Sequence, residues 1–173
     1  TGIGVDTVLG ETSVLRMFNN TITTSTEDGI HVEDYQGERF VFRGNVLTEN
    51  IGDGLELLRY TGPDAEWFID DHVSDGNVGA GIAIEGANGS VLITESIVND
   101  NSTSGITLRD VNNTQDVNAT LIDTVLMSNN GNGLINDLNT GFQELNVTNS
   151  IIDGNGLGLL ATSTGLGTTL ELN

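Results

Sequence analysis

The sequence predicts an all-β fold, a right-handed single-stranded parallel β-helix (a solenoid) of about six to seven coils. Two repeating features carry this prediction. Pairs of a glycine and a following apolar residue recur 24 to 28 residues apart, beginning at Gly29, Gly54, Gly81, Gly105, Gly133 and Gly158. Before each pair lies an apolar residue, followed four positions later by a residue that is almost always asparagine. Repeats of roughly 20 to 50 residues are typical of solenoids, in which each coil stacks on its neighbours.

The apolar residue that begins each repeat is its anchor, and the anchors are Ile22, Val46, Val73, Ile97, Val125 and Ile151. Apolar residues also occupy alternate positions before most anchors and after most of the repeat glycines. Such short runs of period two indicate β-strands, because no apolar stripe at helical spacing persists. Strands that recur at one offset stack in parallel at about 4.8 Å. We therefore expect columns of like residues, with the anchor column in the interior.

The asparagine position predicts a ladder inside one bend of the coil. This position holds Thr26 in the first repeat and asparagine in the next five, which are Asn50, Asn77, Asn101, Asn129 and Asn155. Amide side chains stacked at strand spacing donate and accept hydrogen bonds along the stack. Each amide can therefore satisfy its neighbour away from water.

Three strings of the sequence resemble the parallel β-helix repeats of the pectin-lyase-like superfamily. They are N-N-T-I at 19–22, D-G-I-H-V at 28–32 and T-N-S-I-I-D-G-N at 148–155. The resemblance covers nearly the whole chain and implies the same fold. It leaves the activity open, because the superfamily includes polysaccharide lyases, glycoside hydrolases, epimerases, phage tailspikes and adhesin passengers, and a fold does not select among functions.

The composition limits the partners and the setting of the protein. The chain has 25 acidic residues, five arginines and no lysine, which gives a formal net charge of −20. This charge repels nucleic acid and anionic membranes, and no stretch is apolar enough to insert into a membrane. An acidic surface stays soluble at high ionic strength, where screening relieves its self-repulsion. We therefore expect an extracellular or cell-surface location, and the absence of cysteine excludes thiolate metal sites.

The chain is predicted to be one β-helix domain over residues 1–173, forming a segment of a longer solenoid or multidomain protein. The repeat is already under way at Gly4 and Val5, and a strand pattern is still running at 170–173. Open coils expose strand edges and apolar side chains. We therefore expect either flanking β-helix coils or end-to-end self-association.

The consecutive residues Asp70, Asp71 and His72 are the candidate catalytic group. Paired carboxylates can carry out acid–base hydrolysis of glycosidic bonds. The resemblance implies two further patterns, a calcium-assisted elimination with Arg or Lys as base and a hydrolase pattern with Gly-His-Gly and Arg-x-Lys. The chain has no lysine and neither hydrolase string. A chance pairing of acids in an acidic protein therefore remains the simpler interpretation.

A column of carboxylates two residues before the anchors is the candidate metal site. It contains Asp71, Glu95 and Asp123, which stacking would place roughly 5 Å apart. Like charges at this spacing either turn outward into water or bind a hard cation through their oxygens. No resident cofactor is expected, and Ca²⁺ is the one candidate ion.

Arg109 is predicted to lie in a surface ion-pair ladder between two acids. Counting four residues beyond each glycine places Glu85 one coil before Arg109 and Asp137 one coil after it. A guanidinium fork reaches carboxylates at this spacing. The alternative is that Arg109 acts as a base or binds a sugar carboxylate.

Two functions remain open at this point. The first is a non-catalytic extracellular module, adhesin-like or structural, that contacts polysaccharide. The second is a fragment of a carbohydrate-active enzyme, namely a polysaccharide lyase, a glycoside hydrolase or an epimerase. The short connections between the strands favour the first, because active-site loops are usually longer.

Overall fold

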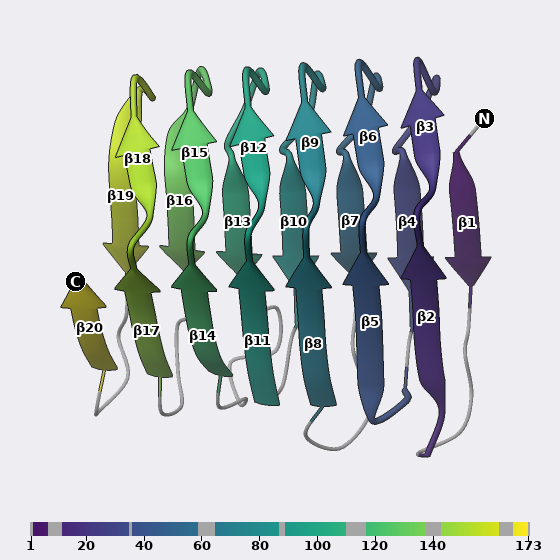
Figure 1. Ribbon diagram of the computed structural model, residues 1–173, viewed down its shortest axis with the longest axis horizontal. Helices are drawn as coiled ribbons and strands as arrows, with labels where there is room; N and C mark the ends of the chain where they lie inside the picture. Colours follow the sequence, from purple (N-terminus) through teal and green to yellow (C-terminus); the bar gives the residue numbers. More distant parts are fainter. Residues whose placement is uncertain are drawn as a thin grey trace.

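The computed structural model describes residues 2–6, 12–34, 36–58, 65–86, 89–109, 117–137, 143–162 and 168–172. Within these ranges the chain forms twenty β-strands and no helix, so none that could span a membrane occurs there. The strands lie in three parallel sheets, and successive strands join sheets A, B and C in turn (Figure 1). The predicted parallel β-helix is confirmed, and the number of coils is close to the expected number.

Sheet A has the order β1 (Ile3–Asp6), β4 (Ile30–Glu33), β7 (Leu55–Leu58), β10 (Ile82–Glu85), β13 (Ile106–Arg109), β16 (Asn132–Asp137) and β19 (Leu157–Thr162). Sheet B has the order β2 (Val14–Phe18), β5 (Arg39–Arg43), β8 (Ala65–Asp70), β11 (Gly89–Thr94), β14 (Val117–Ile122), β17 (Gln143–Thr148) and β20 (Thr168–Leu172). Sheet C contains β3 (Thr21–Thr23), β6 (Val46–Thr48), β9 (Val73–Asp75), β12 (Ile97–Asn99), β15 (Val125–Met127) and β18 (Ile151–Asp153).

The core consists of columns of apolar side chains that follow the strand register. Along sheet A, Ile30 pairs with Leu55, Leu55 with Ile82, and Ile82 with Ile106, and all four are fully buried. Sheet B faces them with larger side chains, including Phe40, whose ring packs at a tilt of 35° against the buried Trp67 at a centroid distance of 5.6 Å. Because side chains alternate between the two faces of a strand, the same strands present their other residues to the outside.

Two columns of bends join the sheets, and each bend contains one residue in the left-handed region. Between sheets B and C this residue has φ between 49° and 64°, and the column is Asn19, Gly44, Asp71, Glu95, Asp123 and Asn149. Between sheets C and A the column is Thr24, Glu49, Gly76, Asp100, Ser128 and Gly154. Glycine, asparagine and aspartate tolerate positive φ better than other residues. This requirement accounts for their frequency at these two positions.

The repeat glycines are required by close approach between coils. A Cβ atom added to Gly105 would lie 2.6 Å from the carbonyl oxygen of Gly133 and 2.9 Å from Nδ2 of Asn129. The same contact recurs one coil earlier, where a Cβ on Gly81 would lie 2.9 Å from the carbonyl oxygen of Gly105. Backbone atoms of the next coil occupy the space of a side chain, so the recurring glycine is a packing requirement.

The structure corrects two details of the predicted register. The anchors do not form an interior column: Ile97 is 43% exposed, Ile151 is 53% exposed, and Val46, Val73 and Val125 are only half-buried, whereas Ile22 packs against the core. The buried position of sheet C is the next residue, as in Leu47 and Val98. The residue directly after the left-handed one faces inward, as the buried Ser96 does after Glu95, so the anchor that follows it faces outward. In the first coil the partner of Val46 is Thr21, one residue before Ile22. The prediction that the anchors form a column in the interior was therefore wrong for the exposed anchors.

Candidate functional site

The predicted asparagine ladder is present and stabilises the bend between sheets C and A. Nδ2 of each asparagine donates to Oδ1 of the asparagine in the next coil, at 2.8 Å from Asn50, 2.9 Å from Asn77, 3.0 Å from Asn101 and 2.9 Å from Asn129 to Asn155. The same oxygens also accept backbone N–H groups. In the first coil the N–H that bonds to Asn50 comes from Ser25 instead of the expected Thr26, because of the register shift. The ladder is therefore structural.

The candidate catalytic residues Asp70, Asp71 and His72 do not share one space. Asp70 binds Nε of Arg43 at 3.0 Å and accepts a 2.6 Å hydrogen bond from Oγ1 of Thr94. Asp71 is exposed at the left-handed bend. His72 is fully buried, and its burial lowers the imidazole pKa to about 4, so the ring is neutral at pH 7. The buried His72 and the exposed Asp71 are therefore not brought together.

The candidate metal residues Asp71, Glu95 and Asp123 lie in the bend column between sheets B and C. All three are exposed, with φ of 50°, 49° and 52°. Their oxygens do not converge: among the described residues, a different group of three has ligand atoms within 4.8 Å of one another. The stacking of the residues was predicted correctly, but the residue types at this position reflect the positive φ. All three residues are exposed, and Oδ1 of Asp123 accepts a hydrogen bond from Nδ2 of Asn149 in the next coil.

The predicted surface ion pair of Arg109 is present. Nη1 of Arg109 donates to Oε1 of Glu85 at 2.9 Å. The register of β13 and β16 places Asp137 opposite Arg109 on the other side. Arg109 therefore lies in the predicted column between two acids, on the outer face of sheet A.

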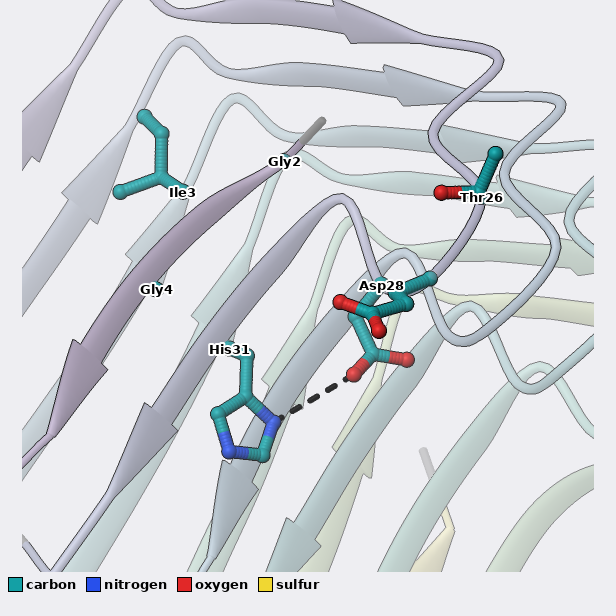
Figure 2. A pocket seen from close by; sticks show the side chains of 7 residues that line it. Gly2, Ile3, Gly4, Thr26, Asp28 and His31 are labelled. Carbon is teal, nitrogen blue, oxygen red and sulfur yellow. Dashed lines mark ion pairs between the residues drawn. The ribbon is translucent and has the colours of Figure 1, made fainter.

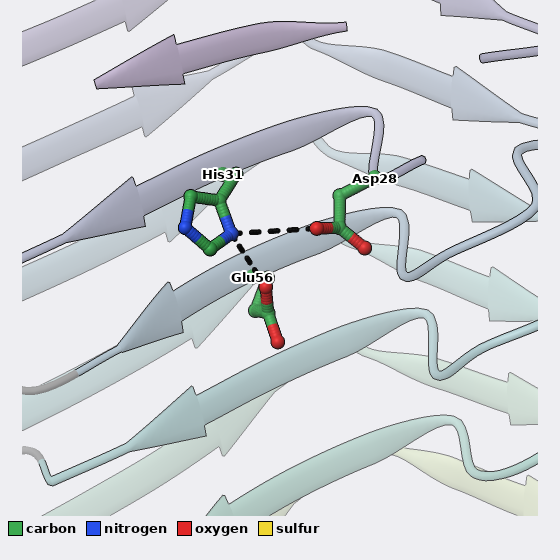
Figure 3. A group of neighbouring side chains, drawn as sticks. All are labelled: Asp28, His31 and Glu56. Atoms are coloured by element: carbon green, nitrogen blue, oxygen red, sulfur yellow. Dashed lines mark hydrogen bonds and ion pairs between the residues drawn. The ribbon is translucent and has the colours of Figure 1, made fainter. Parts of the chain in front are cut away.

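The group that the structure does bring together is Asp28, His31 and Glu56. His31 projects outward from β4, and the strand register places Glu56 of β7 directly beside it. Nδ1 of His31 lies 2.5 Å from Oε2 of Glu56 and 3.3 Å from Oδ2 of Asp28 (Figure 3). Nε2 of the same ring lies 3.5 Å from Oε2 of Glu33. One imidazole therefore lies among three carboxylates from two neighbouring coils.

The position of Asp28 is fixed by the backbone of the next coil. Oδ1 of Asp28 accepts the N–H of Asp53 at 2.7 Å, which leaves Oδ2 toward His31. Asp53 repeats this arrangement by accepting the N–H of Ala80. Carboxylates that accept backbone N–H groups are held in one orientation, so this part of the site is rigid before any ligand binds.

The cluster is partly shielded from water, and this changes its titration. The side chains of Asp28, His31 and Glu56 are 21%, 27% and 22% exposed. Burial, with the negative charge and hydrogen bond of Asp28 as further causes, raises the pKa of Glu56 to about 7. Burial likewise raises the pKa of Asp53 to about 6. Near pH 7 Glu56 is therefore partly protonated, whereas an exposed glutamate would be ionised.

A hollow of about 520 Å³ lies beside the cluster. It is lined by Gly2, Ile3, Gly4, Thr26, Glu27, Asp28 and His31, and both Asp28 and His31 are seen at its wall in Figure 2. Its lining combines backbone and small residues with a carboxylate and an imidazole. A small ligand or water can therefore reach the two side chains.

The sequence interpretation missed this cluster although a signal for it was present. His31 and Glu56 both stand two residues after a repeat glycine, and Asp28 stands one residue before Gly29. The predicted ion pair of Arg109 comes from the column four residues after the glycine, and the His31–Glu56 pair comes from the column at two residues. Side chains at one offset in successive repeats are neighbours in a parallel β-helix, so the offset identifies the pair.

A second polar feature is the outward face of β2, β5 and β8, which we call the arginine face. Its outward residues form three rows across the strands, namely Val14–Arg39–Glu66, Arg16–Val41–Phe68 and Phe18–Arg43–Asp70. Phe18 is 49% exposed, and Arg16, Arg39 and Arg43 are all exposed. In Figure 1 these strands lie side by side near the N-terminal end.

These features define a parallel β-helix protein with a buried amide ladder and a largely acidic surface. Residues 2–173 match the family described as the right handed beta helix region, and the chain belongs to that family. The predicted handedness is thereby confirmed. No curated protein and no solved structure gives a match to the chain. The family match establishes the fold and leaves the function to the site.

Proposed function

We propose that this chain is a non-catalytic β-helix module of an extracellular or cell-surface protein, and that it binds an acidic polysaccharide through the arginine face. The observation that carries the proposal is the exposed Phe18 with Arg43 directly beside it on β5 and Arg16 two residues before it on β2; Arg39 lies farther along the same face, beside Val14 and paired with Glu66. These are three of the five arginines of the chain.

The chemistry of this face suits a sugar polymer that carries carboxylates. A guanidinium group binds a carboxylate through two parallel hydrogen bonds, and it is more weakly hydrated than an ammonium group. Phe18 offers an exposed apolar ring against which a sugar ring can pack. Arg16 is exposed and forms no ion pair with a described residue, so its guanidinium group can reach a ligand.

The rest of the surface favours binding at this face. The net charge of −20 repels an acidic polymer elsewhere on the molecule, and long-range repulsion of this kind is screened by salt. Residues proposed from the sequence for catalysis also have structural contacts, since Asp70 pairs with Arg43 and His72 is buried. Both observations support a binding module with one oriented contact surface.

Affinity electrophoresis in gels that contain a uronate polysaccharide tests the proposal. We expect the wild-type chain to be retarded relative to a gel with a neutral polysaccharide. Arg16→Gln combined with Phe18→Ala should abolish the retardation, because both side chains face outward and their loss leaves the core intact. Arg109→Gln is the matched control, since it removes one positive charge from a different sheet. Equal retardation of all three proteins would reject the arginine face.

The alternative function is a carbohydrate-active enzyme, and one observation favours it. Glu56 has a pKa raised to about 7 beside His31, and perturbed groups beside a hollow are typical of acid–base sites. Incubation with acidic and neutral polysaccharides, with and without Ca²⁺, distinguishes the two functions. New reducing ends or unsaturated products that Glu56→Gln abolishes would establish the enzyme and overturn the binding module.

A further inference from the structure

We propose that Asp28, His31 and Glu56 bind a divalent transition-metal ion of the Zn²⁺ type. These are the only described residues that supply three ligand atoms within 4.8 Å of one another. Their combination of one imidazole nitrogen and two carboxylate oxygens is a donor set that zinc accepts. The inference is independent of the polysaccharide proposal, because the arginine face lies on sheet B and this cluster lies on and beside sheet A.

The distances fit a four-coordinate ion after a small side-chain movement. Ligand atoms about 2.0–2.2 Å from a tetrahedral zinc ion lie roughly 3.3–3.6 Å from each other. Nδ1 of His31 and Oδ2 of Asp28 are already 3.3 Å apart. Oε2 of Glu56 lies 2.5 Å from the same nitrogen and would move away by about 1 Å to admit the ion. A rotation of the Glu56 side chain on its fixed strand supplies this movement.

The surroundings support His31 as a ligand through Nδ1. Histidines that bind metals usually donate the N–H of their other ring nitrogen to a carboxylate or a carbonyl, which fixes the tautomer. Nε2 of His31 lies 3.5 Å from Oε2 of Glu33, which faces outward from the same strand. Oδ1 of Asp28 is occupied by the N–H of Asp53, which leaves Oδ2 for the ion. Two supporting contacts that a zinc site requires are therefore present before the ion binds.

The charge around the cluster also favours a cation. Glu33 lies 3.5 Å from Nε2 of His31, and Asp53 bonds to Asp28 through its N–H, so two further acidic residues stand beside the two carboxylate ligands. A doubly charged ion would compensate the negative charge gathered there. The hollow beside Asp28 and His31 leaves room for water at the remaining coordination position (Figure 2).

The donor set selects among metals. Ca²⁺ and Mg²⁺ prefer six or more oxygen ligands, and an imidazole is a poor ligand for either. Imidazole with carboxylate suits zinc and its first-row neighbours. The site therefore differs in chemistry from the all-carboxylate calcium site that the sequence suggested at Asp71, Glu95 and Asp123.

Isothermal titration of the chelator-treated chain with Zn²⁺ and, separately, with Ca²⁺ tests the proposal. We expect one Zn²⁺ per chain, with at least tenfold weaker binding of Ca²⁺. His31→Gln and Glu56→Gln should each weaken Zn²⁺ binding by at least tenfold. Asp123→Asn removes an exposed carboxylate outside the cluster and should leave the affinity unchanged. Circular dichroism verifies that each variant is folded.

A spectroscopic measurement keeps the test independent of whether His31→Gln folds. Co²⁺ in a four-coordinate site with a nitrogen ligand gives visible absorption bands, and these should form in the wild-type chain and be lost on Zn²⁺ addition. Glu56→Gln should remove them. Diffuse binding of several ions with equal affinity in wild type and variants would show adventitious attraction to an acidic protein. That result, or the absence of Zn²⁺ binding in the wild type, would overturn the proposal.

Discussion

Nδ2 of Asn77 donates a 2.9 Å hydrogen bond to Oδ1 of Asn101, and the backbone N–H of Asn77 donates to the same oxygen at 3.1 Å. Both residues are fully buried. Nδ2 of Asn101 in turn donates to Oδ1 of Asn129 and to the carbonyl oxygen of Ser74. One amide thus satisfies backbone and side-chain groups of three coils, so the ladder replaces the water that the bend excludes.

Asn101→Ala is therefore expected to destabilise the protein by about 3–4 kcal/mol. The substitution leaves the N–H and Nδ2 of Asn77, Oδ1 of Asn129 and the carbonyl of Ser74 without these contacts. The free energy of unfolding in urea measures the effect. Asn130→Ala is the matched control, because Asn130 is exposed in the equivalent bend of the next coil. A cost below about 1 kcal/mol, equal to that of the control, would contradict a structural ladder.

Gly105→Ala tests the packing reason for the repeat glycine. Its Cβ would lie 2.6 Å from the carbonyl oxygen of Gly133, and a backbone atom cannot move aside without shifting a whole coil. We expect a loss of about 2–4 kcal/mol or failure to fold. Gly4→Ala makes the same chemical change where no atom lies within 4 Å of the new Cβ. Thermal unfolding of both variants measures the difference, and equal melting temperatures would show that the glycine is conserved in the repeat for another reason.

The fold could be predicted from the sequence because its determinants repeat. The repeat glycine allows neighbouring coils to approach closely, the buried asparagine bonds the bend, and the alternating apolar residues form the core. Every coil needs these three features at the same offset in the repeat. Single positions were predicted less well. Ile97 was predicted to lie inside, but it is 43% exposed. The left-handed residue Glu95 is followed by the buried Ser96, so Ile97 faces outward, and the sequence alone did not show this. An apolar residue is tolerated on an exposed bend, so residue type did not identify its direction.

The candidate site was predictable only in part. Asp71, Glu95 and Asp123 were correctly stacked, but their residue types follow from the positive φ of the bend, which the sequence did not show. The pairing of His31 with Glu56 follows from the repeat offset alone. The contribution of Asp28 does not, because the direction of Oδ2 depends on which oxygen accepts the N–H of the next coil.

The ion pair between Arg109 and Glu85 is expected to contribute about 1 kcal/mol or less, because both side chains are partly exposed to solvent. Arg109→Gln should lower the melting temperature slightly at low ionic strength and hardly at all at high salt. A double-mutant cycle with Glu85→Gln measures the coupling between the two residues. If Arg109→Gln instead abolished binding or cleavage of a polysaccharide with stability unchanged, the arginine would serve a ligand.

His72 should make the stability of the protein depend on pH. The ring is fully buried against Phe42, at a centroid distance of 4.8 Å, and Nδ1 lies 2.9 Å from the carbonyl oxygen of Asn45. Burial lowers its pKa from 6.5 to about 4 in the folded protein. Between these values the unfolded chain binds a proton that the folded protein does not. Stability is therefore fully present above pH 6.5 and is lost as the pH falls toward 4.

The expected loss between pH 7 and pH 5 is about 2 kcal/mol, from about 1.4 kcal/mol per pH unit below 6.5. Asp53 and Glu56 act in the opposite direction, because their pKa values are raised and their protonation on acidification favours the folded state. The contribution of His72 is therefore isolated by comparing wild type with His72→Gln, whose side chain does not titrate. Urea unfolding at the two pH values should show a steeper decrease for wild type than for the variant. Parallel decreases would mean that His72 is protonated in the folded protein at pH 5.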